Sequence, residues 1–322
     1  MTAAACVRAL RDRLAPVARR WGLTPVARRW GFAPMALRLS KPEAAAVAGR
    51  TALLRSMLPL RGHGLEIGPG YNPLLPKAEG FDVETADYTD AAGLRMKYRD
   101  NPHVDLARIE PVDHVLTSGR SLAEAVGRPG TFSYIVASHV IEHTPDPLGF
   151  LLSCETLLAP GGVLLLAVPD KRHCFDVLQP LTSTGAVLQA HLDRRTRPPP
   201  GAVFDDIAYN AVRGGAIGWT PADHRPLEFF ASLEAAAAAY ESAQRLPGYV
   251  DVHVQRFVPS SFRLIMRDLR DIGAIGLREA LFHDSVGNEF YMTLSPSGAG
   301  CPVDRLTLAK RAMAEQASTI VA

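Results

Sequence analysis

The stretch LEIGPGYNP, residues 65–73, decides the fold. A short apolar strand, Gly64 to Ile67, carries a carboxylate near its end and runs into a turn with two glycines. Glycine at such a turn permits a positive φ and lets the backbone approach a ligand closely. Asn72 tolerates left-handed geometry where a third glycine would otherwise stand. Parallel α/β sheets bind ligands at this first strand-to-loop turn, so the stretch predicts a binding site.

Strands and helices alternate around this turn. The expected strands are 64–67, 81–86, 114–117, 134–137 and 163–168, and the expected helices are 46–57, 122–126 and 148–158. Such alternation predicts a parallel sheet with helices on both faces. Two later strands, 276–282 and 289–294, follow an amphipathic helix that we expect to be capped by Ser260 or Ser261. The fold class is therefore α/β: a Rossmann-like, doubly wound, mostly parallel seven-stranded sheet with an antiparallel last strand, plus a lid insertion.

The chain divides into five expected parts. They are a basic Pro/Arg/Trp repeat extension (1–45), a cofactor-binding core (46–180), a lid or substrate insertion (181–250), the C-terminal part of the core (251–296) and a tail helix (297–322). The insertion is assigned because TRPPPG, RGG and an alanine-rich helix interrupt the alternation.

Charge is unevenly distributed. Residues 1–42 hold nine Lys/Arg and one Asp, so acidic groups outnumber basic ones in the rest of the chain. We therefore expect no nucleic-acid partner for the body, because phosphate neutralisation needs clustered Lys/Arg. The repeat LAPVARRWG, LTPVARRWG, FAPMALRLS (14–40) is interrupted by prolines, and the basic N-terminus could contact an anionic membrane surface or a protein partner.

The cysteines predict a reducing compartment. Cys6, Cys154, Cys174 and Cys301 are too scattered for a C-x-x-C motif and are interpreted as reduced thiols. No apolar run reaches membrane length. We expect a cytoplasmic protein, with peripheral membrane association as the alternative.

The residues around the turn limit which class of ligand the site can bind. Pro73 replaces the third glycine of a dinucleotide fingerprint, and no Gly-Lys-Ser/Thr follows to form a phosphate loop. Glu66 lies beside the turn, and Asp87 ends the next strand, where a carboxylate can accept hydrogen bonds from both ribose hydroxyls. Two acids at one turn favour a nucleoside that carries a cationic group, as S-adenosylmethionine does.

Four motifs in order resemble the class I S-adenosylmethionine-dependent methyltransferases, in particular the type 11 methyltransferase-domain group. They are LEIGPG, VETADY, FSYIVASHVIEHTPDP and LLAPGGVLLLAVPD, and they cover residues 60 to 170. The resemblance implies S-adenosylmethionine as cofactor. It implies contacts from Glu66, Gly68, Gly70 and Asn72 at the methionine end, Asp87 at the ribose, Tyr88 and Ser118 near adenine, and Ser138 and His139 near the methionine or substrate. The chain departs from the family pattern at Asn72 and at NPLLP, which cannot support a long helix.

The segment SHVIEHTPDP carries the candidate catalytic groups His139, Glu142 and His143. One interpretation is structural, with these side chains orienting the turn. A second makes His143 or His139 the general base for an acceptor hydroxyl. His173 after the fifth strand, and His224 and His253 flanking the insertion, are further candidates. A third follows from resemblance to the E-x-x-E-H metal site of small-RNA 2′-O-methyltransferases. In that case His139, Glu142 and His143 would bind a divalent metal, which is not the favoured reading.

The sequence thus predicts an S-adenosylmethionine-dependent methyltransferase acting on the hydroxyl of a small molecule, sugar or glycan. The alternative is a non-catalytic module of the same fold that binds a cofactor or nucleotide.

Overall fold

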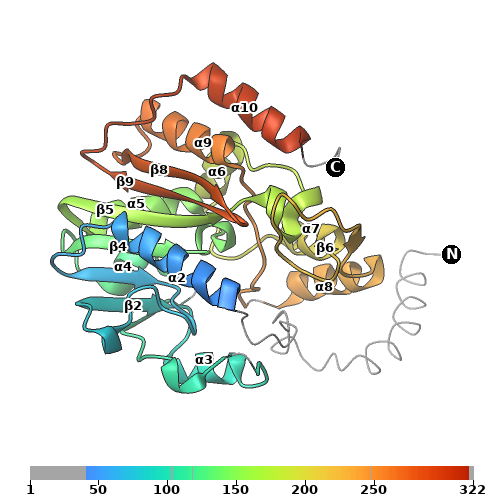
Figure 1. Cartoon of the computed structure of the whole chain (residues 1–322), viewed down its shortest axis with the longest axis horizontal. Coiled ribbons are helices and arrows are strands. Elements are labelled where there is room, and N and C mark those ends of the chain that lie inside the picture. Colours follow the sequence, from blue (N-terminus) through green and yellow to red (C-terminus); the bar gives the residue numbers. More distant parts are fainter. Residues whose placement is uncertain (1–40, 103, 118, 247, 319–322) are drawn as a thin grey trace. The chain divides into compact units, whose positions relative to one another are not determined.

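The computed structural model describes residues 41–102, 104–117, 119–246 and 248–318 (Figure 1). Seven strands form the main sheet: β1 (Gly64–Ile67), β2 (Val83–Asp87), β3 (His114–Val115), β4 (Phe132–Ser138), β5 (Leu158–Pro169), β8 (Arg278–Val286) and β9 (Glu289–Ser295). Their order is β3-β2-β1-β4-β5-β9-β8. The pairs among β1 to β5 are parallel, whereas β9 runs antiparallel to both β5 and β8. The Rossmann-like, mostly parallel sheet with an antiparallel last strand is thereby confirmed.

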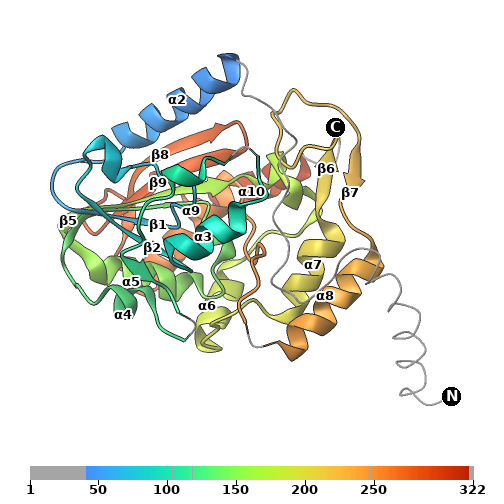
Figure 2. The ribbon, with the colours of Figure 1, turned by 90° about the horizontal axis from the view of Figure 1, so that it is seen from below.

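The helices cover both faces of the sheet. They are α2 (Lys41–Ser56), α3 (Ala91–Tyr98), α4 (Leu122–Val126), α5 (Pro147–Leu157), α6 (Thr184–Leu192), α7 (Pro200–Tyr209), α8 (Leu233–Arg245), α9 (Pro259–Asp271) and α10 (Arg305–Ala317). Figure 2 shows α2 on one side of the sheet and α4, α5 and α6 on the other. Short 3₁₀ turns occupy 77–79, 106–108, 141–143, 171–173 and 175–178.

Alternation along the central strands explains the two-sided core. In β4, Ile135 and Ala137 face the cluster formed with α4, α5, α6 and α9, while Tyr134 and Val136 face the cluster formed with α2. All four side chains are at most 1% exposed. A strand buried on both faces must be apolar at every position, which is why its sequence shows a continuous apolar run.

The register brings the functional strand ends to one edge. Ile67 pairs with Ala86 of β2 and with Ala137 of β4, so the residue after each of these three positions lies at the same carboxyl edge. Those residues are Gly68, Asp87 and Ser138.

The structure corrects several boundaries. The expected strand 276–282 runs instead from Arg278 to Val286, because the hairpin closes tightly at Gly287, whose φ is 66°. The cap of α9 is Val258, with Pro259 at the first helical position. Ser261 is inside the helix, where its Oγ accepts a hydrogen bond from the Val258 N–H. Helix α3 is an element that the apolar pattern did not predict, and Asp90 caps it.

The segment between β5 and α9 contains a small structure of its own. Helices α7 and α8 pack together through Val203, Ile207 and Ala236, beside the two-stranded sheet of β6 (Ala211–Arg213) and β7 (Leu227–Phe229). Both views place these elements at one side of the main sheet (Figures 1 and 2). Helix α6 differs, since its Val187 belongs to the core of the main sheet.

The N-terminal repeat lies outside the described residues. Among the helices that the structure does describe, none has the length and apolar character needed to cross a bilayer.

Candidate functional site

The glycine turn after β1 is built by backbone geometry. Gly68 and Gly70 have φ values of 66° and 55°, which an L side chain rarely adopts. The N–H of Gly68 continues the sheet by donating to the Ala86 carbonyl at 2.8 Å. The N–H of Gly70 donates to Oδ2 of Asp87 at 3.1 Å, so the turn is tied directly to the acid that ends β2.

Glu66 holds the loop that follows this turn. Its two carboxylate oxygens accept the N–H groups of Leu74 (2.6 Å) and Leu75 (2.9 Å), and its side chain is buried. Burial raises the pKa of Glu66 to about 7, against the opposing effect of these two hydrogen bonds. The Glu66 carboxylate thus fixes the conformation of this loop through hydrogen bonds to its backbone. Asn72 is exposed on that loop, and its backbone N–H donates to the Pro69 carbonyl at 3.0 Å.

Asp87 and Tyr88, at the end of the neighbouring strand β2, lie next to the glycine turn. Asp87 is 4% exposed and accepts the Tyr88 N–H at 2.8 Å. Burial raises its pKa, although the hydrogen bonds from Tyr88 and Gly70 oppose the shift. The Tyr88 ring is exposed, and Nζ of Lys97 lies 4.9 Å from its centre. A fixed carboxylate beside two positive-φ glycines and an exposed aromatic ring fits the ribose and adenine of S-adenosylmethionine.

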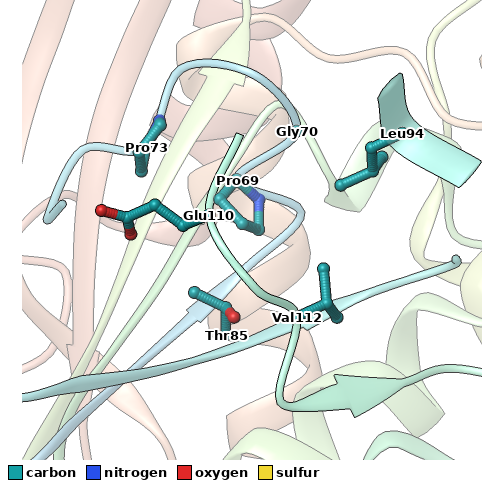
Figure 3. A pocket seen from close by; sticks show the side chains of 7 residues that line it. All are labelled: Pro69, Gly70, Pro73, Thr85, Leu94, Glu110 and Val112. Atoms are coloured by element: carbon teal, nitrogen blue, oxygen red, sulfur yellow. The ribbon is translucent and has the colours of Figure 1, made fainter. Parts of the chain in front are cut away.

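A small void lies at the turn, with Pro69 and Gly70 among the residues that line it (Figure 3). It measures about 10 Å³, which is room for roughly one water molecule and not for a nucleoside. Its lining residues are Pro69, Gly70, Pro73, Thr85, Leu94, Glu110 and Val112.

The end of β4 is held by an arginine and a carboxylate from distant parts of the chain. Arg50 of α2 donates to Ser138 Oγ at 2.8 Å and forms a bidentate ion pair with Glu289 of β9. His139 Nε2 lies 2.8 Å from Oε2 of the same glutamate. His139 has a φ of 54°, an unusual value for a residue with a side chain, and these contacts hold it there.

His139 is poorly suited to be a base. Burial disfavours its charged form, but the neighbouring carboxylates of Glu142 and Glu289 outweigh burial and raise the pKa of His139 to about 10. An imidazole with that pKa is protonated at neutral pH and can donate a proton but not accept one.

The next turn brings a carboxylate and two imidazoles together. Glu142 is 1% exposed, and its Oε1 lies 3.9 Å from His143 Nε2 and 4.0 Å from His253 Nε2. The two imidazole rings meet edge to face, with centroids 4.5 Å apart. One ligand atom from each of the three lies within 4.8 Å of the others. This set differs in one member from the set considered from the sequence, since His253 takes the place of His139.

Two sequence-predicted residues do not join this group. His173 follows β5, and no hydrogen bond or ion pair connects its side chain to His139 or His143 within the part of the chain that the structure describes. Desolvation lowers the pKa of His173. Ser118 lies outside the described residues.

The contacts of the Gly68 turn support a first prediction. A Cβ at Gly68 would lie 2.8 Å from Cγ2 of Val140, and the φ of 66° adds strain. Gly127 has the same φ of 66°, but a Cβ there would meet nothing within 4 Å. We expect Gly127→Ala to cost roughly 1–2 kcal/mol from backbone strain alone, and Gly68→Ala to cost about 1 kcal/mol more because Val140 must move.

The measurement is denaturant unfolding of both variants together with titration by S-adenosylhomocysteine. Only Gly68→Ala should lose affinity for the nucleoside. Equal losses of stability and affinity in the two variants would show that the turn does not need close packing against Val140.

Comparison with known proteins gives the family. Residues 41–224, more than half of the chain, match the family model described as a methyltransferase domain. The ubiquinone biosynthesis O-methyltransferase of Xanthomonas campestris pv. campestris (strain B100) is 39% identical over 60 residues, covering 19% of this chain and 24% of the relative. That of Burkholderia ambifaria (strain MC40-6) is 37% identical over 104 residues, covering 30% and 40%. The chain thus spans less than half the length of these curated relatives.

Two solved structures are similar at low identity. The DhpI–SAH complex is 17% identical, with 91% of this chain and 95% of that chain covered and a TM-score of 0.37. The glycopeptide N-methyltransferase MtfA is 13% identical, with 81% and 99% covered and a TM-score of 0.33. Scores this low carry no argument about substrate. Because the family model matches more than half of its length, this chain belongs to the methyltransferase domain family.

Proposed function

We propose that this chain is an S-adenosylmethionine-dependent methyltransferase that transfers the methyl group to a hydroxyl oxygen of a small molecule or glycan. The observation that carries the proposal is the group formed by Glu142, His143 and His253, whose ligand atoms lie within 4.8 Å of one another. The group is close to the cofactor turn, because the Gly68 turn packs against Val140, two residues before Glu142. Groups of this kind can accept the proton that an alcohol must lose as it attacks.

Methyl transfer requires the protein mainly to position the two reactants. S-adenosylmethionine supplies an electrophilic methyl carbon on a sulfonium. A bond forms between the acceptor oxygen and that carbon, the carbon–sulfur bond breaks with its electron pair going to sulfur, and the hydroxyl proton leaves toward the Glu142 group. Holding the two reactants in line can supply roughly 7–11 kcal/mol of the acceleration.

We assign the acceptor to a hollow whose wall includes the three residues that follow His253. It measures about 220 Å³ and is lined in part by the insertion that begins at residue 181 and in part by the segment 254–256. The backbone N–H groups of Val254 and Gln255 donate to the Glu142 carbonyl at 2.7 and 2.9 Å, so one wall of the pocket is fixed to the residue that bears the carboxylate. We propose that residues 181–250 act as a lid that encloses the acceptor here.

Oxygen is the proposed acceptor atom for two reasons. The similar curated proteins are named O-methyltransferases, although the match covers less than half of each. A neutral amine carries its own lone pair and needs no base for attack, whereas a hydroxyl gains from a buried proton-accepting group such as this one.

The test uses matched acceptors. The full chain is incubated with S-adenosylmethionine bearing a deuterated methyl group and with pairs that differ only in hydroxyl or amine, such as a catechol against its aminophenol and a sugar against its amino sugar. We expect deuterated methyl ethers and stoichiometric S-adenosylhomocysteine from the hydroxyl members. Methylation of the amine members alone would contradict the choice of oxygen.

A further inference from the structure

Glu142 is a buried carboxylate without a hydrogen-bond partner. Both of its oxygens are inaccessible to solvent, and neither makes a hydrogen bond to any residue that the structure describes. His139 Nδ1 lies 3.4 Å from Oε1 but lacks hydrogen-bond geometry. Burying an ionised carboxylate in this way costs several kcal/mol unless a cation or donors compensate it.

Two imidazoles face this carboxylate with the nitrogens that are not otherwise used. His143 and His253 each direct Nε2 toward Oε1 of Glu142, at 3.9 and 4.0 Å. These separations are too long for hydrogen bonds. An ion with tetrahedral ligands at about 2.1 Å holds those ligands about 3.4 Å apart, so side-chain movements of roughly 0.5 Å would bring these groups onto one ion.

The other nitrogen of each imidazole lies near a carboxylate. Nδ1 of His253 forms a hydrogen bond with Oδ2 of Asp176 at 2.5 Å. Nδ1 of His143 lies 3.0 Å from Oδ1 of Asp251 but without hydrogen-bond geometry. A metal-binding histidine typically has this carboxylate partner, which fixes the ring and leaves the opposite nitrogen free for the ion.

The lysine and arginine side chains nearby pair with the outer carboxylates and not with Glu142. Lys97 Nζ donates to Asp251 at 2.9 Å, and Arg256 Nε lies 3.4 Å from Asp176. The inner carboxylate is therefore left with imidazoles alone. One carboxylate with two imidazoles is a ligand set that suits divalent transition ions, whereas magnesium and calcium prefer oxygen ligands throughout.

We propose that Glu142, His143 and His253 bind one divalent transition-metal ion, with Asp176 and Asp251 orienting the two imidazoles. Three protein ligands leave coordination positions open. Resting on the proposed function above, the open positions would hold the acceptor oxygen and favour loss of its proton.

The site would also join two segments of the chain. Glu142 and His143 belong to the turn after β4, while His253 and its partner Asp176 lie on either side of the insertion between β5 and α9. Metal binding should therefore stabilise the folded chain as well as prepare the acceptor.

The test measures metal binding without cofactor, acceptor or turnover. The untagged full chain is stripped with a chelator and titrated with Co²⁺ by visible absorption and with Mn²⁺ by electron paramagnetic resonance, and the melting temperature is recorded with and without metal. We expect one bound ion per chain and a higher melting temperature. Because no methyl transfer is involved, a failed acceptor assay leaves this result intact, and a failed titration leaves the acceptor assay intact.

Three variants and one control locate the ion. Glu142→Gln and His253→Gln should each weaken binding by more than about 100-fold, and Asp176→Asn by about 10- to 100-fold. His191→Gln is the matched control, because His191 is a partly exposed histidine that lies 2.8 Å from Asp146, away from this group. Its affinity should equal that of the wild type.

Folding gives an independent readout. The melting temperature of Glu142→Gln should not respond to added metal, whereas that of the wild type should rise. The proposal is overturned if the wild type binds no stoichiometric Co²⁺ or Mn²⁺, or if Glu142→Gln binds as tightly as the wild type.

Discussion

Replacing Asp87 by Asn is expected to weaken the binding of S-adenosylhomocysteine by about 10- to 150-fold. The Asp87 carboxylate ends β2 at the glycine turn and already accepts the N–H groups of Gly70 and Tyr88. Its remaining lone pairs are the ones that we assign to the ribose hydroxyls. Hydrogen bonds to a charged group contribute about 1.5–3 kcal/mol, which corresponds to that range of affinity.

Asp90→Asn is the control for this measurement. Asp90 lies three residues further on and caps α3 by accepting the Gly93 N–H at 2.8 Å. Asn is about as good a helix cap as Asp, so stability and affinity should both stay close to the wild type. If calorimetry finds the same affinity in the Asp87 and Asp90 variants, the ribose contact must lie elsewhere.

Replacing Glu289 by Gln is expected to lower the free energy of unfolding by about 3–5 kcal/mol. Glu289 is 5% exposed and is the common partner of Arg50 and His139, and the Tyr291 hydroxyl also donates to it at 3.0 Å. Removing its charge leaves two partly buried cationic groups without their common anion. For a chain of this size the melting temperature should fall by roughly 10 °C.

The control is the same substitution in an exposed ion pair. Glu241 and Arg245 form an i,i+4 pair on α8 at 2.9 Å, and both side chains are largely in solvent. Glu241→Gln should cost no more than about 0.5 kcal/mol. Equal losses in the two variants, by denaturant unfolding at low salt, would mean that Glu289 does not hold the end of β4.

The fold could be predicted from the sequence because its signals are local. A strand buried on both faces must be apolar throughout, and β1 and α4 were predicted with the bounds that they have. The placement of Asp87 next to the glycine turn could also be predicted. Asp87 ends the strand that follows this turn in the chain, and neighbouring parallel strands end at the same edge of the sheet.

The rest of the site depends on contacts between distant residues. Glu289 meets His139 across 150 positions of the sequence, and nothing near either residue indicates the pairing. His253 was noticed only as one histidine beside the insertion. Its convergence with Glu142 requires the backbone of Val254 and Gln255 to bond the Glu142 carbonyl, which no spacing rule predicts.

Glu66 illustrates a limit of a different kind. A carboxylate beside a glycine turn fits either a ligand with positive charge or a loop with unpaired N–H groups. The sequence could not separate the two, because Leu74 and Leu75 show no pattern that marks their amides as needing an acceptor. In the structure both oxygens of Glu66 are taken by these amides, so its contribution to binding is through the shape of the loop.

The central claim is that the Gly68 to Asp87 edge binds the nucleoside of S-adenosylmethionine. The most direct measurement is calorimetric titration of the full chain with S-adenosylhomocysteine, alongside the same titration with NAD⁺. We predict saturable binding of S-adenosylhomocysteine at one site per chain and no binding of NAD⁺. Absence of S-adenosylhomocysteine binding by a folded chain, or preferential binding of NAD⁺, would contradict the account.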